Sequence, residues 1–490
     1  MGERAYLEGR KLAPAHLGSV LVLGLGKSGK AVADYCLSLL GTRVEAVAVA
    51  AGAPTDEALA WADRARRRGA LVLFDHEAIE GSYDLCIASP GISQFSDFYR
   101  SAAAKSGEIV SEVEFAWRES AADSKWVAIT GTNGKTTTTA LTCHLLRAAD
   151  FDAVAVGNIG DTCIQAVAER APEVYVAEVS SYQLASTCNF VPDVAVVLNI
   201  TPDHLSWHGS LEAYAEAKWK VLANLGPSGG TAVLNACDDA VRARIRAVRA
   251  EGGFPYPYIP IGTSEGVGGD MRRACGSENA AFRGDGGCLE VNLGTQRCDL
   301  VYVDDLQIKG AHNQENALAA ASAALLLGAT PIQVSQGLLS FAPLEHRIEP
   351  AGVVGGVECY NDSKATNVDA TLVALTAFLP KHPIVLLGGR DKGTDLAPLV
   401  AACEEHAKAV VCFGEARDRF LAAFDASSVP CVLEAPGMEG ALDAALSIAE
   451  PGDVVVLSPA CASFDEFSCF EERGEVFKQL VADRAAGKRA

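Results

Sequence analysis

The sequence has few features of a secreted, membrane-spanning or cysteine-rich metal protein. Its 15 cysteines are an odd number, no two lie closer than eight positions, and no C-x-x-C motif occurs, which excludes a zinc ribbon and a thioredoxin-type centre. The longest apolar helix candidate, residues 317–327, is too short to span a bilayer. The N-terminal residues are charged and lack the apolar stretch of a signal peptide. We therefore expect a cytoplasmic protein with reduced thiols and no membrane insertion.

Positive charge is also scarce. The chain has 41 lysine and arginine residues against 62 acidic residues, so its formal net charge is −21. This acidity disfavours nucleic acid and anionic membranes as partners. If the ligands are anionic, local lysines, metal ions and backbone N–H groups must hold them. The 490 residues, 49% of them apolar, are enough for about three domains with their own cores.

The most informative stretch is residues 127–139, Val-Ala-Ile-Thr-Gly-Thr-Asn-Gly-Lys-Thr-Thr-Thr-Thr. An apolar run, a glycine loop and a helical pattern follow one another, which is the architecture that cradles phosphates. Lys135 would reach the outer phosphates of a nucleotide, and Thr136 would offer its hydroxyl to Mg²⁺. The position six before Lys135 is Ile129, whereas the P-loop pattern has glycine there. The alternative is an ordinary turn between a strand and a helix.

Two neighbouring strand ends carry further candidate ligands. Glu178 interrupts an apolar strand near its C-terminal end, where ligands of open α/β sheets lie, and a buried carboxylate there favours a metal over a structural salt bridge. His204 follows the next strand. His204 and His208 are four residues apart and could form a zinc pair, but no third ligand accompanies them, so we expect His208 to be a surface or capping residue. Lys218 lies on an amphipathic helix, where a lysine is usually solvated.

The N-terminal segment contains a second glycine loop. Gly24-x-Gly26-x-x-Gly29 follows an apolar strand and matches the dinucleotide fingerprint. The next strand, residues 44–50, ends without the acidic residue that would bind the ribose of NAD, so the loop suits a diphosphate better than NAD. A third strand runs into a turn at residues 89–92 that exposes backbone N–H groups.

Three strand ends in the C-terminal part present cations and a hydroxyl. Lys364, Lys392 and Ser463 each follow a predicted strand. Solvated loops would explain any one of them, but their recurrence at one sheet edge indicates a small anion site. The alternation of strands and helices predicts an α/β fold with three domains: an N-terminal Rossmann-like domain (1–113), a central P-loop ATPase-like domain with a parallel sheet (114–343) and a C-terminal Rossmann-like domain (344–490).

Together these motifs resemble the ATP-dependent Mur ligases of peptidoglycan assembly, over nearly the whole chain. The segments shared with Mur and folylpolyglutamate ligases are residues 130–136, 157–160, 178–184, 203–204, 217–218, 312–316 and 346–347. The stretches 361–367 (Asn-Asp-Ser-Lys-Ala-Thr-Asn) and 457–463 (Leu-Ser-Pro-Ala-Cys-Ala-Ser) are similar to those of the members that add D-glutamate.

The resemblance implies a set of site residues. ATP would be bound by Gly131, Thr132, Asn133, Gly134, Lys135, Thr136, Thr137, Asn316, Arg347 and Asp362. UDP-N-acetylmuramoyl-L-alanine would be bound by Gly26, Ser28, Ser89, Gly91, Asn158, Ser180 and Gln183. D-glutamate would be bound by Lys364, Thr366, Lys392, Ser463 and Phe470. Two Mg²⁺ ions would be held by Thr136, Glu178, His204 and Lys218, the last as a carbamate that supplies oxygen ligands. Catalytic roles would fall to Lys135, Lys218, His204 and Lys364.

The implied reaction is ATP-dependent amide formation through an acyl phosphate, in a monomer whose third domain closes over the second to exclude water. The chain departs from the family at one point, because family members have an Asp-Thr-Arg-like stretch after the second strand and this strand continues Val47-Ala48-Val49-Ala50. The resemblance therefore does not extend to the uridine contacts of the first domain, although it does extend to the diphosphate loop. Two alternatives are a related ligase for another amino acid, such as a folylpolyglutamate-type enzyme, and a non-catalytic nucleotide sensor that uses residues 24–29. A sensor would not need two metal sites.

Overall fold

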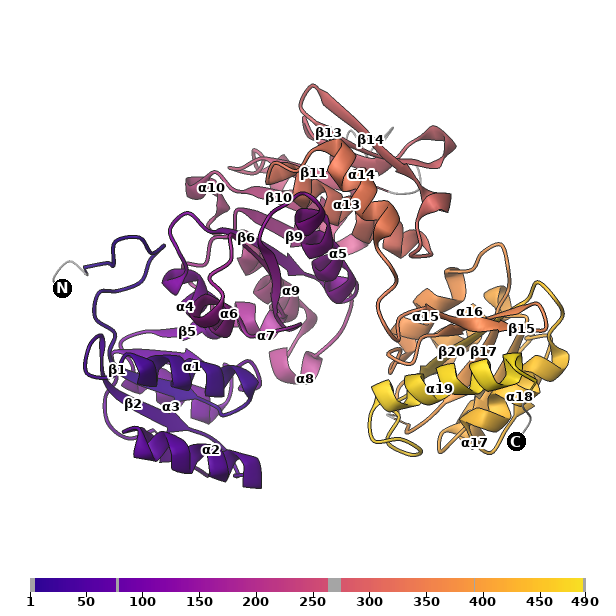
Figure 1. Cartoon of the computed structure of the whole chain (residues 1–490), viewed down its shortest axis with the longest axis horizontal. Helices are drawn as coiled ribbons and strands as arrows, with labels where there is room; N and C mark the ends of the chain where they lie inside the picture. The colour runs from indigo at the N-terminus through magenta and orange to yellow at the C-terminus, as the bar shows by residue number, and fades with distance from the viewer. Residues whose placement is uncertain (1–4, 76–78, 263–274, 392, 488–490) are drawn as a thin grey trace. The chain divides into compact units, whose positions relative to one another are not determined.

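The structure is a computed structural model that describes residues 5–75, 79–262, 275–391 and 393–487. It is an α/β protein with three sheets, which confirms the predicted fold class (Figure 1). By internal contacts the chain forms two compact units. Unit 1 comprises Met1–Asp304 and Glu315–Leu338, and unit 2 comprises Asp305–Gln314 and Leu339–Ala490. Each sheet falls within one of the three predicted segments, while the boundaries at residues 113 and 343 stay predictions.

The first sheet of unit 1 is parallel, with the order β3-β2-β1-β4-β5. Its strands are β1 (Gly18–Leu23), β2 (Val44–Ala50), β3 (Leu71–Leu73), β4 (Leu85–Ala88) and β5 (Ile109–Ser111). Its helices are α1 (Lys27–Ser38), α2 (Asp56–Arg67), α3 (Asp97–Lys105) and α4 (Glu112–Glu119). Successive residues of a strand face opposite sides of the sheet. Accordingly, Val20 and Val22 of β1 belong to one hydrophobic core, and Leu21 and Leu23 belong to another.

The second sheet of unit 1 has nine strands in the order β14-β13-β12-β11-β10-β9-β6-β8-β7. It is parallel from β7 to β12, and β12, β13 and β14 pair antiparallel. The strands are β6 (Lys125–Thr130), β7 (Ala153–Gly157), β8 (Val174–Glu178), β9 (Val194–Val197), β10 (Thr231–Asn235), β11 (Tyr258–Gly262), β12 (Ala280–Arg283), β13 (Cys288–Leu293) and β14 (Gln296–Tyr302). Because β6 lies between β8 and β9, the strand order reverses at β6, which is where open α/β sheets bind ligands.

The helices of this second part of the chain, residues 125–340, are mostly short. The α-helices are α5 (Lys135–Ala148), α6 (Cys163–Glu169), α7 (Ser181–Ala185), α8 (Leu205–His208), α9 (Leu211–Trp219), α10 (Leu225–Ser228), α11 (Asp239–Ala250), α13 (Ala311–Leu326) and α14 (Pro331–Ser340). The 3₁₀ helices are η1 (Lys220–Leu222), η2 (Asp285–Gly287) and η3 (Val303–Asp305).

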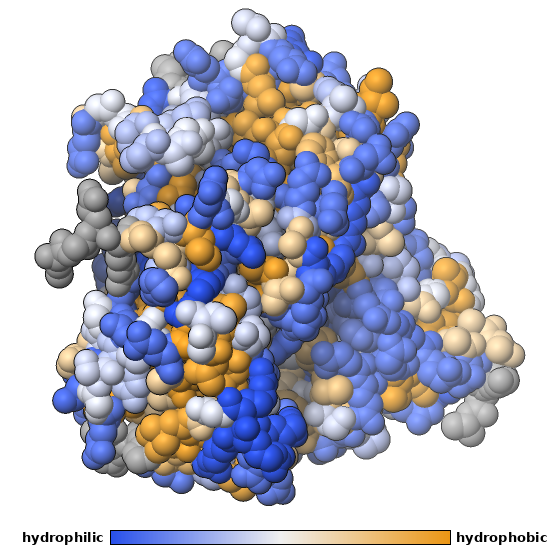
Figure 2. Space-filling view, turned by 60° about the vertical axis from the view of Figure 1, so that its left-hand side comes forward, coloured by the Kyte–Doolittle hydropathy of each residue, from blue (hydrophilic) through white to orange (hydrophobic). Residues whose placement is uncertain are grey.

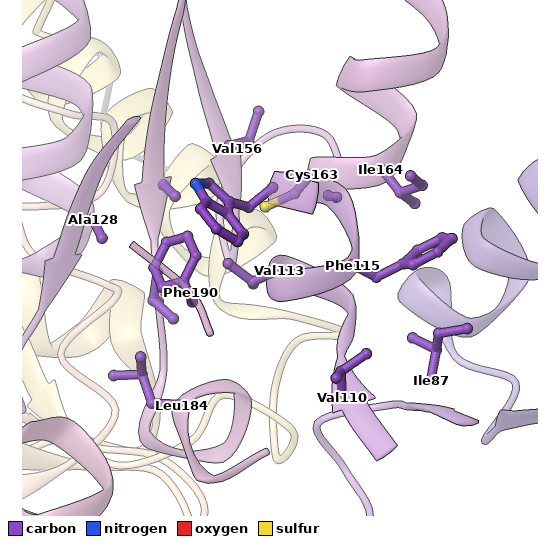
Figure 3. Packing of buried hydrophobic residues seen from close by; sticks show 14 of the residues in the cluster. Ile87, Val110, Val113, Phe115, Ala128, Val156, Cys163, Ile164, Leu184 and Phe190 are labelled. Carbon is purple, nitrogen blue, oxygen red and sulfur yellow. The ribbon is translucent and has the colours of Figure 1, made fainter. Parts of the chain in front are cut away.

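One hydrophobic core joins the two sheets of unit 1. Phe115 of α4 lies near Ile87 and Val110 of the first sheet, while Val113 of the same helix lies toward Phe190 of the second part (Figure 3). All of these side chains belong to the same buried cluster. This shared core explains why the two predicted domains behave as one compact unit.

Unit 2 contains a six-stranded sheet with the order β15-β16-β20-β17-β18-β19. Among its described strands, β15 and β16 pair antiparallel and all other neighbours pair parallel. Its strands are β15 (Glu349–Val354), β16 (Val357–Asn361), β17 (Ile384–Gly388), β18 (Ala409–Phe413), β19 (Val432–Glu434) and β20 (Val454–Ala460). Its helices are α15 (Val368–Thr376), α16 (Ala397–His406), α17 (Arg417–Phe424), α18 (Met438–Ile448) and α19 (Phe470–Ala485). Val385 and Leu387 pack in the core under α15 and α16, and Leu386 packs in the core under α18 and α19.

Hydrophilic residues cover most of the face drawn in Figure 2, and hydrophobic residues are interspersed among them. Among the described residues, no helix combines the length and the hydropathy needed to cross a bilayer.

Candidate active site

The loop between β6 and α5 has the strand–loop–helix geometry that the sequence predicts. Gly134 precedes the helix with φ +81°, in the left-handed region that favours glycine. A Cβ on Gly134 would lie 2.5 Å from Oδ1 of Asn316, which also accepts a hydrogen bond of 3.1 Å from Thr138. This position therefore requires glycine for two reasons, and the predicted nucleotide residue Asn316 lies directly against the loop.

Side-chain hydrogen bonds fix the shape of this loop. Thr132 Oγ1 donates to the Thr201 carbonyl at 3.1 Å, accepts from the Thr201 N–H at 3.0 Å, and lies 2.9 Å from the Tyr214 hydroxyl. Asn133 N–H donates to Oδ1 of Asn199 at 2.7 Å. The loop is thus tied to the segment after β9, which carries His204.

Two lysines converge on the loop. Nζ of Lys135 donates to the carbonyls of Gly131 and Thr132 at 2.9 and 2.8 Å. Nζ of Lys218, from α9, donates to the same Gly131 carbonyl at 2.7 Å. The loop therefore gathers two lysine side chains in a protein whose net charge is −21. Thr136 and Thr137 follow in the first turn of α5.

Lys218 is buried rather than solvated, contrary to what its helix position alone predicts. Only 2% of the residue is exposed, and Nζ lies 4.6 Å from the centre of the Tyr214 ring. Burial lowers the pKa of Lys218 well below its ordinary value, and the charge of Lys135 lowers it further, while Asp203 and Glu178 oppose this shift. A buried lysine with a lowered pKa has access to the neutral amine, which is a nucleophile.

Glu178 ends β8 beside the loop, as predicted. The residue is buried, and its Oε1 accepts a hydrogen bond of 3.3 Å from Nδ2 of Asn158. Its Oε2 is buried without a hydrogen-bond partner in the described structure. An unsatisfied buried carboxylate oxygen is costly unless a cation binds it, so this atom fits a Mg²⁺ ligand.

His204 lies in the same group of residues. Its backbone has φ +54°, and its side chain is 45% exposed. Burial lowers the pKa of His204, Asp203 raises it, and the charges of Lys135 and Lys218 lower it further. The imidazole therefore favours the neutral form, which is the form that binds metal. The structure thus brings together four of the predicted residues, Lys135, Glu178, His204 and Lys218, at the C-terminal ends of β6, β8 and β9.

His208 is a correction to the sequence analysis. It was expected on the surface or at a helix cap, but only 1% of the residue is exposed. Its Nε2 shares a hydrogen bond of 2.9 Å with Ser181 Oγ, and burial lowers its pKa to about 4. The Ser181 contact thus engages one of the two ring nitrogens of His208.

The residues predicted to bind the UDP-linked substrate lie in four segments of unit 1, which are residues 26–28, residues 89–91, Asn158 and residues 180–183. Gly26 and Gly91 are exposed, and Ser28 and Ser89 are half-buried. Lys27, beside Gly26, donates to the Gly160 carbonyl at 2.5 Å, which links the first glycine loop to the turn that carries Asn158. A cleft of about 750 Å³ lies between α1 and α6 and includes Gly26 and Lys27 in its lining.

Ser180 and Gln183 have a structural role as well. They form a capping box on α7: Gln183 N–H donates to Ser180 Oγ at 3.3 Å, and Ser180 N–H donates to Gln183 Oε1 at 2.9 Å. The capping box orients the first turn of α7 beside Glu178.

In unit 2, the loops after β16 and β20 carry the predicted amino-acid site. Nζ of Lys364 lies 5.1 Å from the centre of the Phe470 ring, and Ser463 is buried. Thr366 N–H donates to the Lys364 carbonyl at 2.9 Å. Lys392, also predicted for this site, lies outside the described residues.

Asp362 occupies a buried position at the end of β16. Its oxygens accept hydrogen bonds from Ser458 Oγ at 2.8 Å and from the Ile348 N–H at 3.3 Å. Burial raises the pKa of Asp362 to about 7, against the opposing effects of these hydrogen bonds and of Arg347 and Arg473. The predicted nucleotide residues Asp362 and Arg347 are thus electrostatic neighbours.

Arg473 was missed by the sequence analysis. It is almost fully buried and donates to Ser363 Oγ at 2.9 Å, to the Ser363 carbonyl at 2.8 Å and to the Cys461 carbonyl at 3.2 Å. It therefore joins the loops after β16 and β20. A signal was present, because Arg473, Phe477 and Val481 are spaced by four residues and share the buried face of α19.

Comparison with known proteins agrees with this geometry. Residues 129–324 match the family profile described as Mur ligase middle domain, and residues 346–461 match Mur ligase, glutamate ligase domain. The chain is 38% identical to the UDP-N-acetylmuramoylalanine--D-glutamate ligase of Pelotomaculum thermopropionicum, over 96% of this chain and 98% of that protein. It is 36% identical to the protein of the same name from Bordetella parapertussis, over 95% and 96%.

Solved structures show the same fold at lower identity. A pseudomurein peptide ligase type C from Methanothermus fervidus aligns with a TM-score of 0.53 at 18% identity, over 95% of this chain and 99% of that one. A UDP-N-acetylmuramate-alanine ligase from Thermotoga maritima aligns with a TM-score of 0.51 at 17% identity, over 96% and 99%. With both family profiles matched and relatives above 30% identity along nearly the whole chain, the chain belongs to the Mur ligase family.

Proposed function

We propose that this protein is an ATP-dependent ligase that joins D-glutamate to UDP-N-acetylmuramoyl-L-alanine in the synthesis of peptidoglycan precursors. The observation that carries the chemistry is the convergence of Lys135 and Lys218 on the Gly131 carbonyl, beside the unsatisfied oxygen of Glu178. The choice of substrates is supported by the relatives named UDP-N-acetylmuramoylalanine--D-glutamate ligase at 36–38% identity.

The first chemical step is attack of the substrate carboxylate on the γ-phosphate of ATP, which gives an acyl phosphate and ADP. Negative charge grows on the transferred phosphate, and the ammonium of Lys135 and the N–H groups at the start of α5 would stabilise it. Thr132 and Asn133 keep the loop in this shape through their bonds to Thr201 and Asn199. Asn316, Arg347 and Asp362 would contact the nucleotide.

We propose that Thr136, Glu178, His204 and Lys218 hold two Mg²⁺ ions. The donor set fits, because Glu178 offers an unsatisfied carboxylate oxygen and His204 favours its neutral form. Bound Mg²⁺ would supply charge neutralisation at the phosphate oxygens.

Lys218 as an ammonium would repel a cation. Its burial and its lowered pKa favour a neutral amine that can add to carbon dioxide, which forms a carbamate and releases a proton. A carbamate offers two oxygens of the kind that Mg²⁺ prefers. We therefore propose that Lys218 acts in the carbamylated form.

The second step is attack of the D-glutamate amine on the acyl carbon, which expels phosphate. We assign D-glutamate to Lys364, Thr366, Ser463 and Phe470, with Lys392 beside it. Arg473 supports this site because it holds the two loops that carry Ser363 and Cys461. The acyl phosphate would hydrolyse in open water, so the site must exclude water during the reaction.

The UDP-linked substrate is assigned to the loops around Gly26 and Asn158. Ser28, Ser89 and Gly91 would contact its uridine diphosphate, and Ser180 and Gln183 its sugar and peptide.

The dependence on ATP supports a cytoplasmic location, and we propose a monomer.

The decisive experiment is an amino-acid panel assayed by phosphate release with ATP, Mg²⁺ and UDP-N-acetylmuramoyl-L-alanine. We expect release only when both D-glutamate and the UDP-linked substrate are present, with L-glutamate, D-aspartate and L-lysine at background. Equal or faster release with another amino acid, or with a folate in place of the UDP-linked substrate, would reassign the substrate. No release with any acceptor would favour a nucleotide sensor.

A further inference from the structure

His208 has a buried position that the proposed reaction does not use. It ends α8, a helix of four residues that begins directly after His204. Its Nε2 shares a hydrogen bond of 2.9 Å with Ser181 Oγ, and its Nδ1 is buried without a hydrogen-bond partner in the described structure. Burial of a polar atom without a partner costs free energy, so other contacts of His208 must offset this cost.

The helix α8 is too short to be stable without contacts to the rest of the protein. A single helical turn is unstable in isolation, since nucleation fixes several residues for one hydrogen bond. Within it, the His208 and Trp207 N–H groups donate to the His204 carbonyl at 3.2 and 3.0 Å. The position of the His204 backbone therefore follows the position of His208, and His208 is anchored to α7 through Ser181.

Side-chain ring contacts also couple α7 to His204 and α8. The Tyr182 ring packs against both histidines, with its centre 4.8 Å from that of His204 and 5.6 Å from that of His208, and it is nearly parallel to His208 at 19°. The Trp207 ring lies 4.6 Å from Tyr182. The His204 side chain is 45% exposed, and the Tyr182 and Tyr214 rings, the latter 6.2 Å away, constrain its orientation.

From these contacts we infer that His208 is a positioning residue, which holds His204 against Tyr182 of α7 through its bond to Ser181. The inference rests on the proposed function, because it needs His204 to be a Mg²⁺ ligand. Replacing a residue that orients a metal ligand typically lowers metal affinity or activity by about 10–100-fold.

The test exploits the geometry of the imidazole. In His208→Gln the side-chain amide reaches the place of Nε2 and can keep the Ser181 bond, whereas in His208→Asn the amide reaches only the place of Nδ1. We expect His208→Asn and Ser181→Ala to raise the half-saturating Mg²⁺ concentration about 10-fold, with KM for D-glutamate unchanged. His208→Gln should stay within about threefold of the wild type. Binding of Mn²⁺ with ADP, followed by electron paramagnetic resonance, measures the same affinity without turnover.

Thr187→Ala is the matched control for loss of stability. Thr187 is buried just after α7, and its hydroxyl donates to the Leu184 carbonyl of α7 at 2.8 Å, whereas the Ser181 hydroxyl bonds to His208. Thermal unfolding should show similar losses for Thr187→Ala and Ser181→Ala, while only the latter weakens Mn²⁺ binding. If both weaken Mn²⁺ binding equally, or if Asn and Gln at position 208 behave alike, the role of His208 is structural and the inference fails.

His204→Ala separates this inference from the proposed function. Loss of Mn²⁺ binding in His204→Ala but not in His208→Asn would overturn the inference and leave the metal assignment intact. Wild-type Mn²⁺ binding in His204→Ala would overturn both.

Discussion

Lys218 combines two properties that a lysine seldom has together: it is buried, and it lies beside a second cation. Its Nζ donates to the Gly131 carbonyl, to which Lys135 also donates. Two ammonium groups at one carbonyl repel each other, so the neutral or the carbamylated form of Lys218 is favoured. The choice between these forms can be tested chemically.

We expect Lys218→Ala to be inactive and to recover part of its activity when short carboxylates such as formate or acetate are added. A small carboxylate can occupy the space of the carbamate and supply oxygens to the metal. The measurement is phosphate release against carboxylate concentration. Chloride at equal ionic strength is the control for salt effects.

Lys220→Ala provides the matched lysine control. Lys220 lies two residues further along, and its ammonium donates to the Ala185 carbonyl outside the candidate site. It should keep its activity and show no response to carboxylates. Wild-type activity of Lys218→Ala without any addition would contradict the carbamate.

At the residue scale, the sequence predicted the groups that follow strand ends but not those whose burial depends on distant packing. Glu178 and His204 could be placed because Glu178 ends the apolar strand β8 and His204 lies in the segment after the apolar strand β9 of the same sheet. His208 could not, since a single histidine between Trp207 and Gly209 carries no pattern of burial. Its environment is made by Ser181 and Tyr182 of another helix.

At the scale of elements, the contact between α4 and α6 has a titratable group at its centre. Glu112, at the start of α4, is buried, and its Oε1 accepts a hydrogen bond of 2.7 Å from the Ile164 N–H of α6. Its Oε2 is buried without a partner in the described structure. Burial raises the pKa of Glu112 from 4.5 to about 7, although the backbone hydrogen bonds oppose the shift.

This pKa predicts a pH-dependent stability. Between pH 4.5 and about 7 the folded protein holds a proton on Glu112 that the unfolded chain has lost. The contribution of Glu112 to stability therefore falls as the pH rises through this window, by about 3 kcal/mol at most. Glu112→Gln keeps the acceptor without the charge, so its Tm relative to the wild type should rise between pH 5 and pH 8.

The measurement is thermal unfolding of both proteins across this pH range. Glu169→Gln serves as the control, because Glu169 is an exposed carboxylate on α6, the helix that Glu112 contacts. The Tm difference between Glu169→Gln and the wild type should not change with pH. A flat difference for Glu112→Gln as well would show that Glu112 is ionised or solvated in the folded protein.

Sequence patterns predicted long elements better than short ones. The strands β2 (Val44–Ala50) and β8 (Val174–Glu178) have apolar runs that the sequence reveals, and the loop before α5 is marked by local glycines. The strand β3 (Leu71–Leu73) was missed because three residues carry no measurable periodicity. The shared core of unit 1 was also missed, since Phe115 and Phe190 are too far apart in sequence for any local pattern to join them.

At the scale of the whole molecule, the proposed reaction draws on both compact units. Lys135 belongs to unit 1, and Lys364 belongs to unit 2. A net charge of −21 on each copy opposes self-association, which supports the proposed monomer. Each chain should therefore supply both residues to its own reaction.

Mixing two inactive variants tests this expectation. Lys135→Ala should lose at least about 10²-fold in kcat, because a charge-stabilising group is removed, while binding of the UDP-linked substrate survives. Lys364→Ala should bind ATP normally and lose the response to D-glutamate. In a monomer, an equimolar mixture of the two has no more activity than the separate proteins. If two chains shared their sites, random pairing would restore roughly a quarter of the sites, and phosphate release would rise with the mixed protein concentration.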